Sequence, residues 1–237
     1  MIELHQVTKV YGQRAAVAGV SLRVRAGERV ALVGPNGSGK TTLMRAALGL
    51  VAAGGQVRVG GHDPWTDHRA AMVNVAYVPQ RAPALDAPVG ELVRGWAALR
   101  DRPVESLRDE ALAFGLPVDE VERVPFRSLS GGMQQKLLAA MALASKAHIF
   151  FFDEPTANLD PAARGVFLSR LTSRDPQPTL VLSSHRLDEL QALVDRVVVL
   201  AEGRVRFDDQ LAAFLDAPAL REAAGLSDNL VPFRRRG

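Results

Sequence analysis

The first part of the chain carries apolar residues in short runs of two kinds. Some runs alternate with polar residues, as half-buried strands do, and in the segment 29–33 the residues after Arg29 are continuously apolar, as in buried parallel strands. This buried run leads directly into a glycine-rich loop, and residues 42–50 after the loop have helical spacing. Strands are therefore predicted at residues 2–7, 16–24, 29–33, 56–59 and 73–78.

The pattern changes from residue 85 to residue 144. β-Branched runs become rare, and Ala, Leu, Arg and Glu dominate the composition. Residues 91–100 and 104–114 have helical spacing, and a further helix is expected to begin near Gly132. We interpret residues 85–144 as a helical subdomain inserted into an α/β core made of residues 1–84 and 145–215.

Alternating strands and helices return after this insertion. Such alternation favours a parallel sheet with helices on both of its faces. Residues 216–237 are weakly patterned and are expected to form a C-terminal extension, in which three arginines at 234–236 make a solvated tail. The predicted strands are residues 148–152, 179–183 and 196–200, and the predicted helices are residues 161–172 and 187–193.

Composition narrows the class of protein. The 237 residues are 47% apolar and 23% charged, which is the balance of a folded globular domain. With no cysteine, disulfides and thiolate metal sites are excluded. The chain has neither a signal-peptide pattern at its start nor the ~18 consecutive apolar residues of a membrane span. We expect a cytoplasmic protein, which would need a separate spanning partner to work at a membrane.

A phosphate-binding loop is predicted between the buried strand and the first helix. Residues 34–41 fit the pattern G-x-x-x-x-G-K-[S/T], in which glycines let backbone N–H groups point at phosphate oxygens. The following helix adds its N-terminal dipole, Lys40 supplies a charge to the β- and γ-phosphates, and the Thr41 hydroxyl is a hard ligand for Mg²⁺. The predicted nucleotide contacts are Asn36, Gly37, Ser38, Gly39, Lys40, Thr41 and Thr42.

Two acidic residues at the end of a later apolar strand supply the chemistry that hydrolysis needs. Asp153 and Glu154 follow an isoleucine and three phenylalanines. Because neighbouring residues on a strand face opposite ways, the two carboxylates can take separate tasks. We expect Asp153 to reach the shell of a magnesium ion beside Thr41. Glu154 can then polarise a water for in-line attack on the γ-phosphate of bound ATP.

A third motif resembles a known family. Residues 129–135 read Leu-Ser-Gly-Gly-Met-Gln-Gln at a predicted junction of loop and helix, and they resemble the signature of the ATP-binding cassette (ABC) family. Gln80 after a strand, residues 158–160 (Asn-Leu-Asp) after the carboxylates, and His185 after the next strand follow in the order of that family. The resemblance covers residues 11 to about 208 and implies a P-loop NTPase core with an N-terminal antiparallel β subdomain and an inserted helical subdomain.

The resemblance also implies roles for single residues. Tyr11 is similar to the aromatic residue that stacks on adenine, and Gln80 to the residue that touches Mg²⁺ and the attacking water. His185 resembles the switch that contacts the γ-phosphate, so the implied catalytic set is Glu154, His185, Gln80 and Lys40. The implied metal ligands are Thr41, Gln80 and Asp153.

The signature implies a second subunit. Ser130, Gly131 and Gly132 at a helix N-terminus make another anion site, and in this family it closes over the ATP of a partner cassette. Asp160 resembles the residue that reaches across to that partner. The resemblance therefore implies a dimer, with a copy of the chain or with a similar cassette. Met133, where glutamine is frequent, resembles cassettes of the exporter-like branch that serve separate membrane permease subunits.

Three functions are weighed. The leading hypothesis is the ATP-hydrolysing subunit of a transporter, which couples dimer closure to export or assembly by a membrane subunit. Residues 85–93 and Trp96 are candidate contacts with that subunit. Alternatively, these apolar residues form the core of the helical subdomain itself. The alternative is a soluble ABC-type ATPase acting on DNA or ribosomes, but its usual coiled coil, zinc module or second cassette is lacking, as is a basic stripe. A regulatory binder without turnover conflicts with the intact Glu154 and His185. No nucleic acid is expected as a partner.

Overall fold

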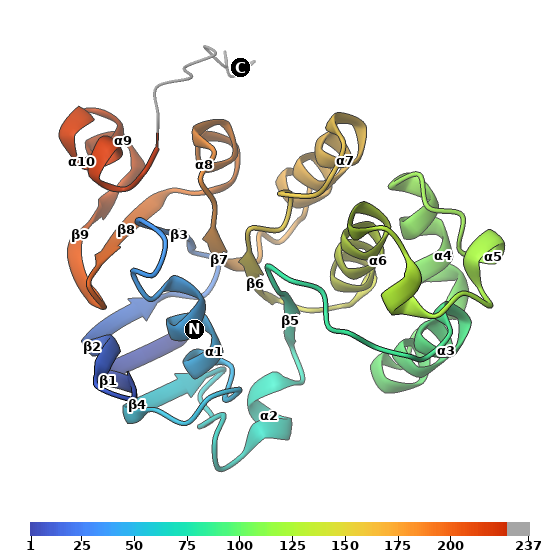
Figure 1. Ribbon diagram of the computed structural model, residues 1–237, viewed down its shortest axis with the longest axis horizontal. Coiled ribbons are helices and arrows are strands. Elements are labelled where there is room, and N and C mark those ends of the chain that lie inside the picture. Colours follow the sequence, from blue (N-terminus) through green and yellow to red (C-terminus); the bar gives the residue numbers. More distant parts are fainter. Residues whose placement is uncertain (227–237) are drawn as a thin grey trace.

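The computed structural model describes residues 1–226, and it contains two sheets (Figure 1). The smaller sheet is antiparallel, with strands in the order β2-β1-β4. Its central strand carries a left-handed residue, Gln6 (φ 50°), at a shift in register, so the alternation of buried and exposed residues is interrupted there. The strands are β1 (Ile2–Tyr11), β2 (Arg14–Val24) and β4 (Gly54–Val59).

The larger sheet has six strands in the order β5-β6-β7-β3-β8-β9. The first five are parallel, as the sequence predicts, and the edge strand β9 is antiparallel to β8. Strand β9 was not predicted, because its charged side chains obscure the alternation of buried and exposed residues. The turn at Glu202 and Gly203, both with positive φ, joins β8 and β9 into a hairpin. The strands are β3 (Arg29–Val33), β5 (Val75–Val78), β6 (Ile149–Asp153), β7 (Thr179–Ser183), β8 (Arg196–Ala201) and β9 (Arg204–Gln210).

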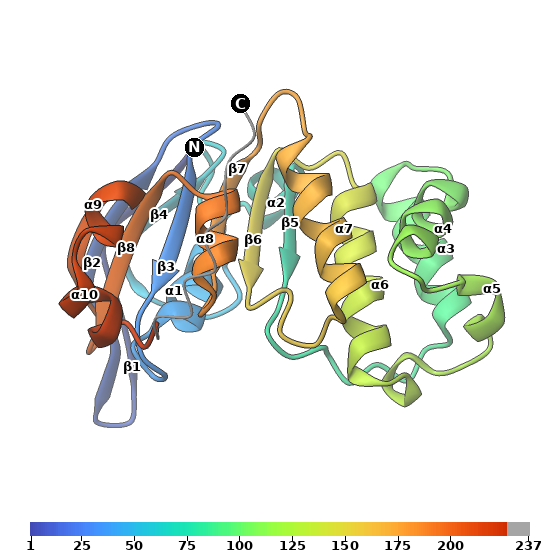
Figure 2. The ribbon, with the colours of Figure 1, turned by 90° about the horizontal axis from the view of Figure 1, so that it is seen from above.

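Helices cover both faces of the larger sheet (Figure 2). On one face, helix α1 (Lys40–Ala47) buries Leu43 and Met44 between the two sheets, against residues such as Phe151. On the other face, Phe150 and Phe152 pack under α6 (Gly131–Ala144), α7 (Pro161–Thr172) and α8 (Leu187–Leu193). Strand β6 is therefore buried on both sides, which explains the continuous run of large apolar side chains that precedes Asp153.

The helices α3 (Val89–Arg100), α4 (Val104–Ala113) and α6 lie together at one end of the molecule (Figure 1). Val89 and Val93 are fully buried there, so these two belong to the core of the helical end and are not an exposed contact surface. Trp96 is partly buried and its Nε1 donates a hydrogen bond to the carbonyl of Met141 at 3.1 Å. Leu85 is the exposed apolar residue of the predicted contact segment.

Short helices account for most of what the sequence analysis left out. Six residues or fewer give too little periodicity to detect in a pattern. In the C-terminal extension, Ala224 and Leu226 are buried, so this segment packs on the core as far as residue 226. The arginines at 234–236 lie outside the described residues. The remaining helices are α2 (His68–Met72), α5 (Val118–Val121), a 3₁₀ turn (Phe126–Ser128), α9 (Leu211–Leu215) and α10 (Pro218–Ala223).

Among residues 1–226, every helix is too short or too polar to span a lipid bilayer.

The contact of α7 with the sheet gives a test of the fold. Phe167 is fully buried and meets Phe152 edge to face, with ring centroids 5.1 Å apart. We expect Phe167→Ala to lower the free energy of unfolding by about 3–5 kcal/mol, because it leaves a cavity against the sheet. Phe167→Leu is the control and should cost under about 1.5 kcal/mol. Urea denaturation of both variants checks this, and equal losses would contradict the packing described.

Candidate active site

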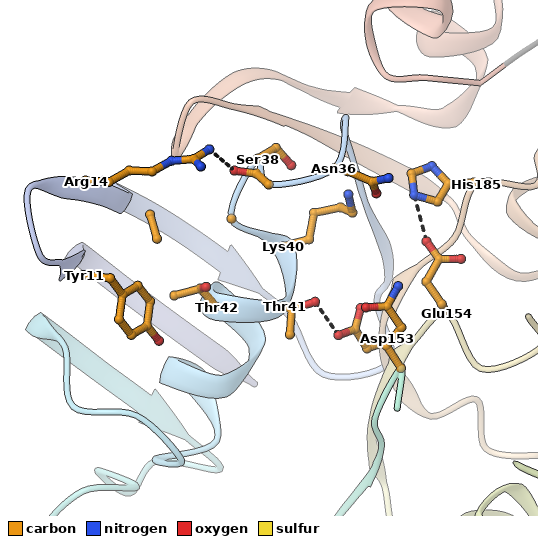
Figure 3. A pocket seen from close by; sticks show the side chains of 14 residues that line it. Tyr11, Arg14, Asn36, Ser38, Lys40, Thr41, Thr42, Asp153, Glu154 and His185 are labelled. Carbon is orange, nitrogen blue, oxygen red and sulfur yellow. Dashed lines mark hydrogen bonds and ion pairs between the residues drawn. The ribbon is translucent and has the colours of Figure 1, made fainter. Parts of the chain in front are cut away.

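Three loops meet at the carboxyl ends of the central parallel strands. The phosphate loop follows β3, Glu154 follows β6, and His185 follows β7. Together with the hairpin of β1 and β2, they enclose a cavity of about 380 Å³ (Figure 3). Ligand sites of open α/β sheets lie at this edge. The residues that line the cavity are Tyr11, Arg14, Ala16, Asn36, Gly37, Ser38, Gly39, Lys40, Thr41, Thr42, Gln80, Asp153, Glu154 and His185.

The phosphate loop fits only a sequence with glycine at certain positions. Gly34 (φ 145°) and Gly39 (φ 108°) have backbone conformations that other residues avoid. A Cβ on Gly34 would lie 2.1 Å from the carbonyl oxygen of Leu200, and a Cβ on Gly39 would lie 2.3 Å from that of Ala16. The loop is therefore held tightly between β8 and β2. Within the described chain, the buried Ser38 hydroxyl has no hydrogen-bond partner, which suits a phosphate oxygen.

Lys40 lies at the start of α1 and is largely buried. Its Nζ donates to the carbonyl of Gly34 at 2.6 Å and to that of Pro35 at 3.3 Å. Burial lowers the pKa of Lys40, and the negative charges of Glu154 and Asp153 act in the opposite direction. Both hydrogen-bond acceptors of this ammonium group are neutral carbonyls. A phosphate brought into the cavity would give it a negatively charged partner.

Asp153 ends β6 and is 1% exposed. The Thr41 hydroxyl donates to its Oδ2 at 2.6 Å, and the Ser183 hydroxyl donates to its Oδ1 at 2.6 Å. Both carboxylate oxygens are thus oriented by hydroxyl groups, one from the first turn of α1 and one from the neighbouring strand β7. A buried carboxylate needs such partners, since an unpaired one would cost several kcal/mol.

Glu154 turns away from Asp153 because the backbone changes direction at the end of the strand. Its φ of 52° lies in the left-handed region, and its N–H donates to the carbonyl of Ser183 at 3.1 Å. Within residues 1–226, no hydrogen bond of ordinary geometry reaches Glu154 Oε1, although His185 Nε2 lies 3.0 Å away. The two acids are separated by this strained turn and not by strand alternation alone.

Burial is the largest cause of the pKa shifts of Glu154 and His185. It raises the pKa of Glu154 to about 7; the charge of Lys40 opposes this rise, and those of Asp153 and Glu189 add to it. Burial also lowers the pKa of His185, with a further lowering by Lys40. A carboxyl group whose pKa lies near neutrality can both accept and release a proton at physiological pH.

The structure gathers most of the predicted site residues and leaves four of them apart. Ser130, Gly131, Gly132 and Asp160 do not line the cavity. Ser130 caps α6 by accepting from the N–H of Met133 at 3.2 Å, and Asp160 caps α7 through the N–H of Ala163 at 2.9 Å. Asp160 also pairs with Lys136 at 2.6 Å, so the two caps belong to neighbouring helices, away from the phosphate loop.

Two functional candidates were missed by the sequence analysis. Arg14 lines the cavity and its Nη2 donates to the carbonyl of Gly37 at 3.2 Å (Figure 3). Ser183 orients Asp153, as described above. The short turn between β1 and β2 places Arg14 opposite Tyr11, and this was the signal available in the sequence, since the two positions are paired across the hairpin.

Comparison with known proteins identifies the group. The family model described as "ABC transporter" matches residues 17–157, more than half of the chain. The chain belongs to the ABC transporter family. This confirms the predicted family and fold class. It also confirms the function class, an ATP-binding and ATP-hydrolysing transporter subunit. The matched range includes the phosphate loop, the signature and both carboxylates, and it excludes Tyr11 and His185.

Individual ABC proteins resemble this chain over most of its length. A probable ABC transporter ATP-binding protein of Azorhizobium caulinodans is 33% identical, with 91% of this chain and 79% of the relative covered. The Nod factor export ATP-binding protein I of Rhizobium etli is 35% identical over 86% of this chain, which spans just under two thirds (66%) of that relative. A solved structure of an ATP-binding subunit of an ABC transporter has a TM-score of 0.81 at 24% identity, covering 94% of this chain and 95% of its own, and it supports the fold.

The raised pKa of Glu154 predicts a dependence of stability on pH. The ordinary value is 4.5 and the folded value is about 7, so the folded chain retains a proton here that the unfolded chain has lost. This group therefore destabilises the fold as pH rises through that window. We expect Glu154→Gln to be more stable than the wild type by about 2–3 kcal/mol at pH 8, and the gain to disappear below pH 5.

Chemical denaturation at pH 5 and pH 8 measures both effects. Glu105→Gln, at an exposed position on α4, is the control and should change stability little at either pH. A gain of equal size at both pH values would contradict the desolvation of Glu154.

Proposed function

We propose that this chain is the nucleotide-binding subunit of an exporter-type ABC transporter, and that it hydrolyses ATP in the cavity between Lys40 and Glu154. One observation carries the proposal: the largely buried Glu154, with a pKa near neutrality and Oε1 within 3.0 Å of His185 Nε2, faces the same cavity as the phosphate loop. A carboxylate placed there can take a proton from a water that attacks the γ-phosphate. Lys40 and the N-terminus of α1 stabilise the charge on the phosphate oxygens.

His185 completes this arrangement. Its Nε2 lies 3.0 Å from Glu154 Oε1, and the lowered pKa favours the neutral imidazole. The single N–H of a neutral ring can be donated either to the Glu154 carboxylate or to the γ-phosphate, so His185 can serve one of these two acceptors at a time without adding a charge to the site. In this proposal, Glu154 moves the proton, and His185 orients Glu154 or the γ-phosphate for the attack by water.

Magnesium is the metal that the site suits. Thr41 Oγ1 and Asp153 Oδ2 lie 2.6 Å apart at the edge of the cavity, and the exposed Gln80 lines the same side. Hydroxyl, carboxylate and amide oxygens are the hard ligands that Mg²⁺ prefers, and Mg²⁺ keeps several waters and phosphate oxygens as its other ligands. When bound, the ion would neutralise charge on the β- and γ-phosphates.

The nucleotide base is proposed to bind at Tyr11. This ring is half exposed at the end of β1, and Lys9 Nζ lies 4.9 Å from its centroid. An exposed aromatic face beside the phosphate loop can stack on adenine. Arg14 is paired with Tyr11 across the hairpin and donates to the carbonyl of Gly37 in the loop, so its guanidinium is available to the phosphates.

A second cassette is proposed to complete the site. Ser130, Gly131 and Gly132 form an N-terminal anion site on α6 that lies away from the phosphate loop of the same chain. Its backbone N–H groups suit the γ-phosphate of a partner's ATP. Asp160, about half exposed and paired with Lys136, is proposed to contact that partner. The dimer would have two such composite sites, whether it forms from two copies or from two similar cassettes.

The membrane partner is proposed to be a separate permease subunit. Support comes from the relatives named for Nod factor export and from Met133, which fits the exporter-like pattern. The subunit would bind at the cytoplasmic face of the membrane. Of the predicted contact segment, Leu85 is the apolar residue exposed for such docking.

Two substitutions separate binding from turnover. We expect Lys40→Ala to weaken ATP binding by about tenfold to a hundredfold, because a charge-assisted contact to phosphate is lost. Glu154→Gln should keep ATP affinity, favour the ATP-bound dimer and lower kcat by about a hundredfold or more, because the base is removed. Calorimetric titration, size-exclusion chromatography and phosphate release measure these effects. Full turnover in Glu154→Gln would refute the assigned base.

Arg14 provides a test that the family motifs do not supply. Arg14→Ala should raise KM for ATP by about threefold to thirtyfold while kcat changes little, since its guanidinium holds Gly37 and faces the phosphates. Arg23→Ala on the same strand, where the side chain pairs with Glu3 on the surface, is the matched control. An unchanged KM in Arg14→Ala would remove this residue from the site.

A further inference from the structure

A buried carboxylate lies behind the active site and does not line its cavity. Glu189, on α8, has a side chain that is 1% exposed. Burying a carboxylate at this depth is unfavourable unless hydrogen bonds and opposite charges compensate for lost hydration. The partners of Glu189 therefore indicate what this group does.

Both oxygens of Glu189 accept hydrogen bonds from other segments. Oε1 accepts from the Thr156 hydroxyl and from Arg164 Nε, the latter at 2.8 Å. Oε2 accepts from the Ser184 hydroxyl at 2.7 Å. Arg186 Nε lies 3.6 Å from Oε1 and adds a second positive charge. Thr156 and Ser184 are themselves buried, so these bonds are shielded from water.

The two hydroxyl partners belong to the two loops that carry the catalytic pair. Thr156 comes two residues after Glu154, and Ser184 comes directly before His185. The Ser184 hydroxyl also accepts from the N–H of Arg186 at 3.1 Å, which fixes the loop on the other side of His185. With the 3.0 Å contact between Glu154 and His185, the segments form a closed ring of contacts that passes through Glu189.

We propose that Glu189 is a positioning residue for hydrolysis, which holds the loops of Glu154 and His185 at their working separation. The inference rests on the proposed function, because it assigns Glu189 to the reaction through those two residues. Removing the carboxylate would leave the buried hydroxyls of Thr156 and Ser184 without their acceptor. The part-buried Arg164 would also lose one of its two carboxylate partners. Displacements of about 1 Å at a catalytic pair are enough to cost about a hundredfold in rate.

The same loop is held from the opposite side by α6. Gln135, which is fully buried, donates its Nε2 to the carbonyl of Pro155 at 2.9 Å. Lys136 pairs with Asp160 at the end of the loop. Residues 154–160 therefore lie between α6 and Glu189, and Glu189 links this loop to the loop of His185 in addition to the direct contact of Glu154 with His185.

The packing of α8 does not depend on Glu189. Leu187, Leu190 and Leu193 are buried on the same helix and anchor it to the hydrophobic core. Glu189→Gln keeps the shape of the side chain and all of these apolar contacts. It removes the charge and replaces one acceptor by a donor, so Ser184 can no longer donate as it does now.

Steady-state ATP hydrolysis by Glu189→Gln tests the inference. We expect kcat to fall tenfold or more, as estimated for misplaced catalytic groups, while KM and the affinity for ATP stay within about threefold. The matched control is Glu110→Gln, because Glu110 is a part-buried glutamate that accepts from Arg170 on α7 at 3.0 Å, outside the active site. The control should keep kcat within about twofold, at a temperature where circular dichroism shows both variants folded.

A double mutant separates this inference from the function on which it rests. If Glu189 acts by setting the separation between Glu154 and His185, then removing His185 removes its effect, and His185→Ala with Glu189→Gln should be no slower than His185→Ala alone, within about twofold. Multiplied effects would overturn the inference, as would kcat within twofold of wild type in Glu189→Gln or an equal loss of ATP affinity and kcat. Wild-type turnover in His185→Ala would contradict the proposed role of His185 itself, and with it this inference.

Discussion

Parallel pairing of β3, β7 and β6 sets the geometry on which the active site depends. In this register Ser183 lies opposite both Leu32 and Asp153, so the three strands end at nearly the same level. The loops that leave them therefore begin side by side, although the loop after β3 is more than a hundred residues from the other two in sequence. The hydrogen bond from Thr41 to Asp153 is a direct result of this alignment. Strand register is strongly specified when both faces of a strand are buried, as they are for β6.

The charges of the site follow from the same arrangement. Lys40, Asp153 and Glu154 are brought together in a region with little water, and each is stabilised differently. Asp153 has two hydroxyl donors, Lys40 uses carbonyls of its own loop, and Glu154 has a pKa that burial raises to about 7, so below that pH it is buried in its neutral form. The site is thus poised for a ligand that brings negative charge to Lys40 and a water to Glu154.

The sequence was sufficient for the motifs and the long elements, and insufficient for features that arise only from packing. The parallel strands and the helices at 161–172 and 187–193 were predictable, because their apolar patterns are strong and continuous. The backbone turn at Glu154 was not, since a positive φ at glutamate has no local signal. Arg14 and Glu189 were also missed, because their roles come from partners that are distant in sequence, such as Gly37 and Thr156.

The helical end of the molecule shares one continuous hydrophobic cluster with the sheet. Leu107 and Phe126 of that end and Phe150 and Phe167 of the α/β part belong to the same set of contacting buried residues. Because these elements share one core, we expect the inserted helices and the nucleotide site to unfold together as a single cooperative unit. The consequence is thermodynamic: ATP bound at the sheet edge raises the unfolding temperature of the distant helices as well, since ligand binding stabilises the whole unit to which the site belongs.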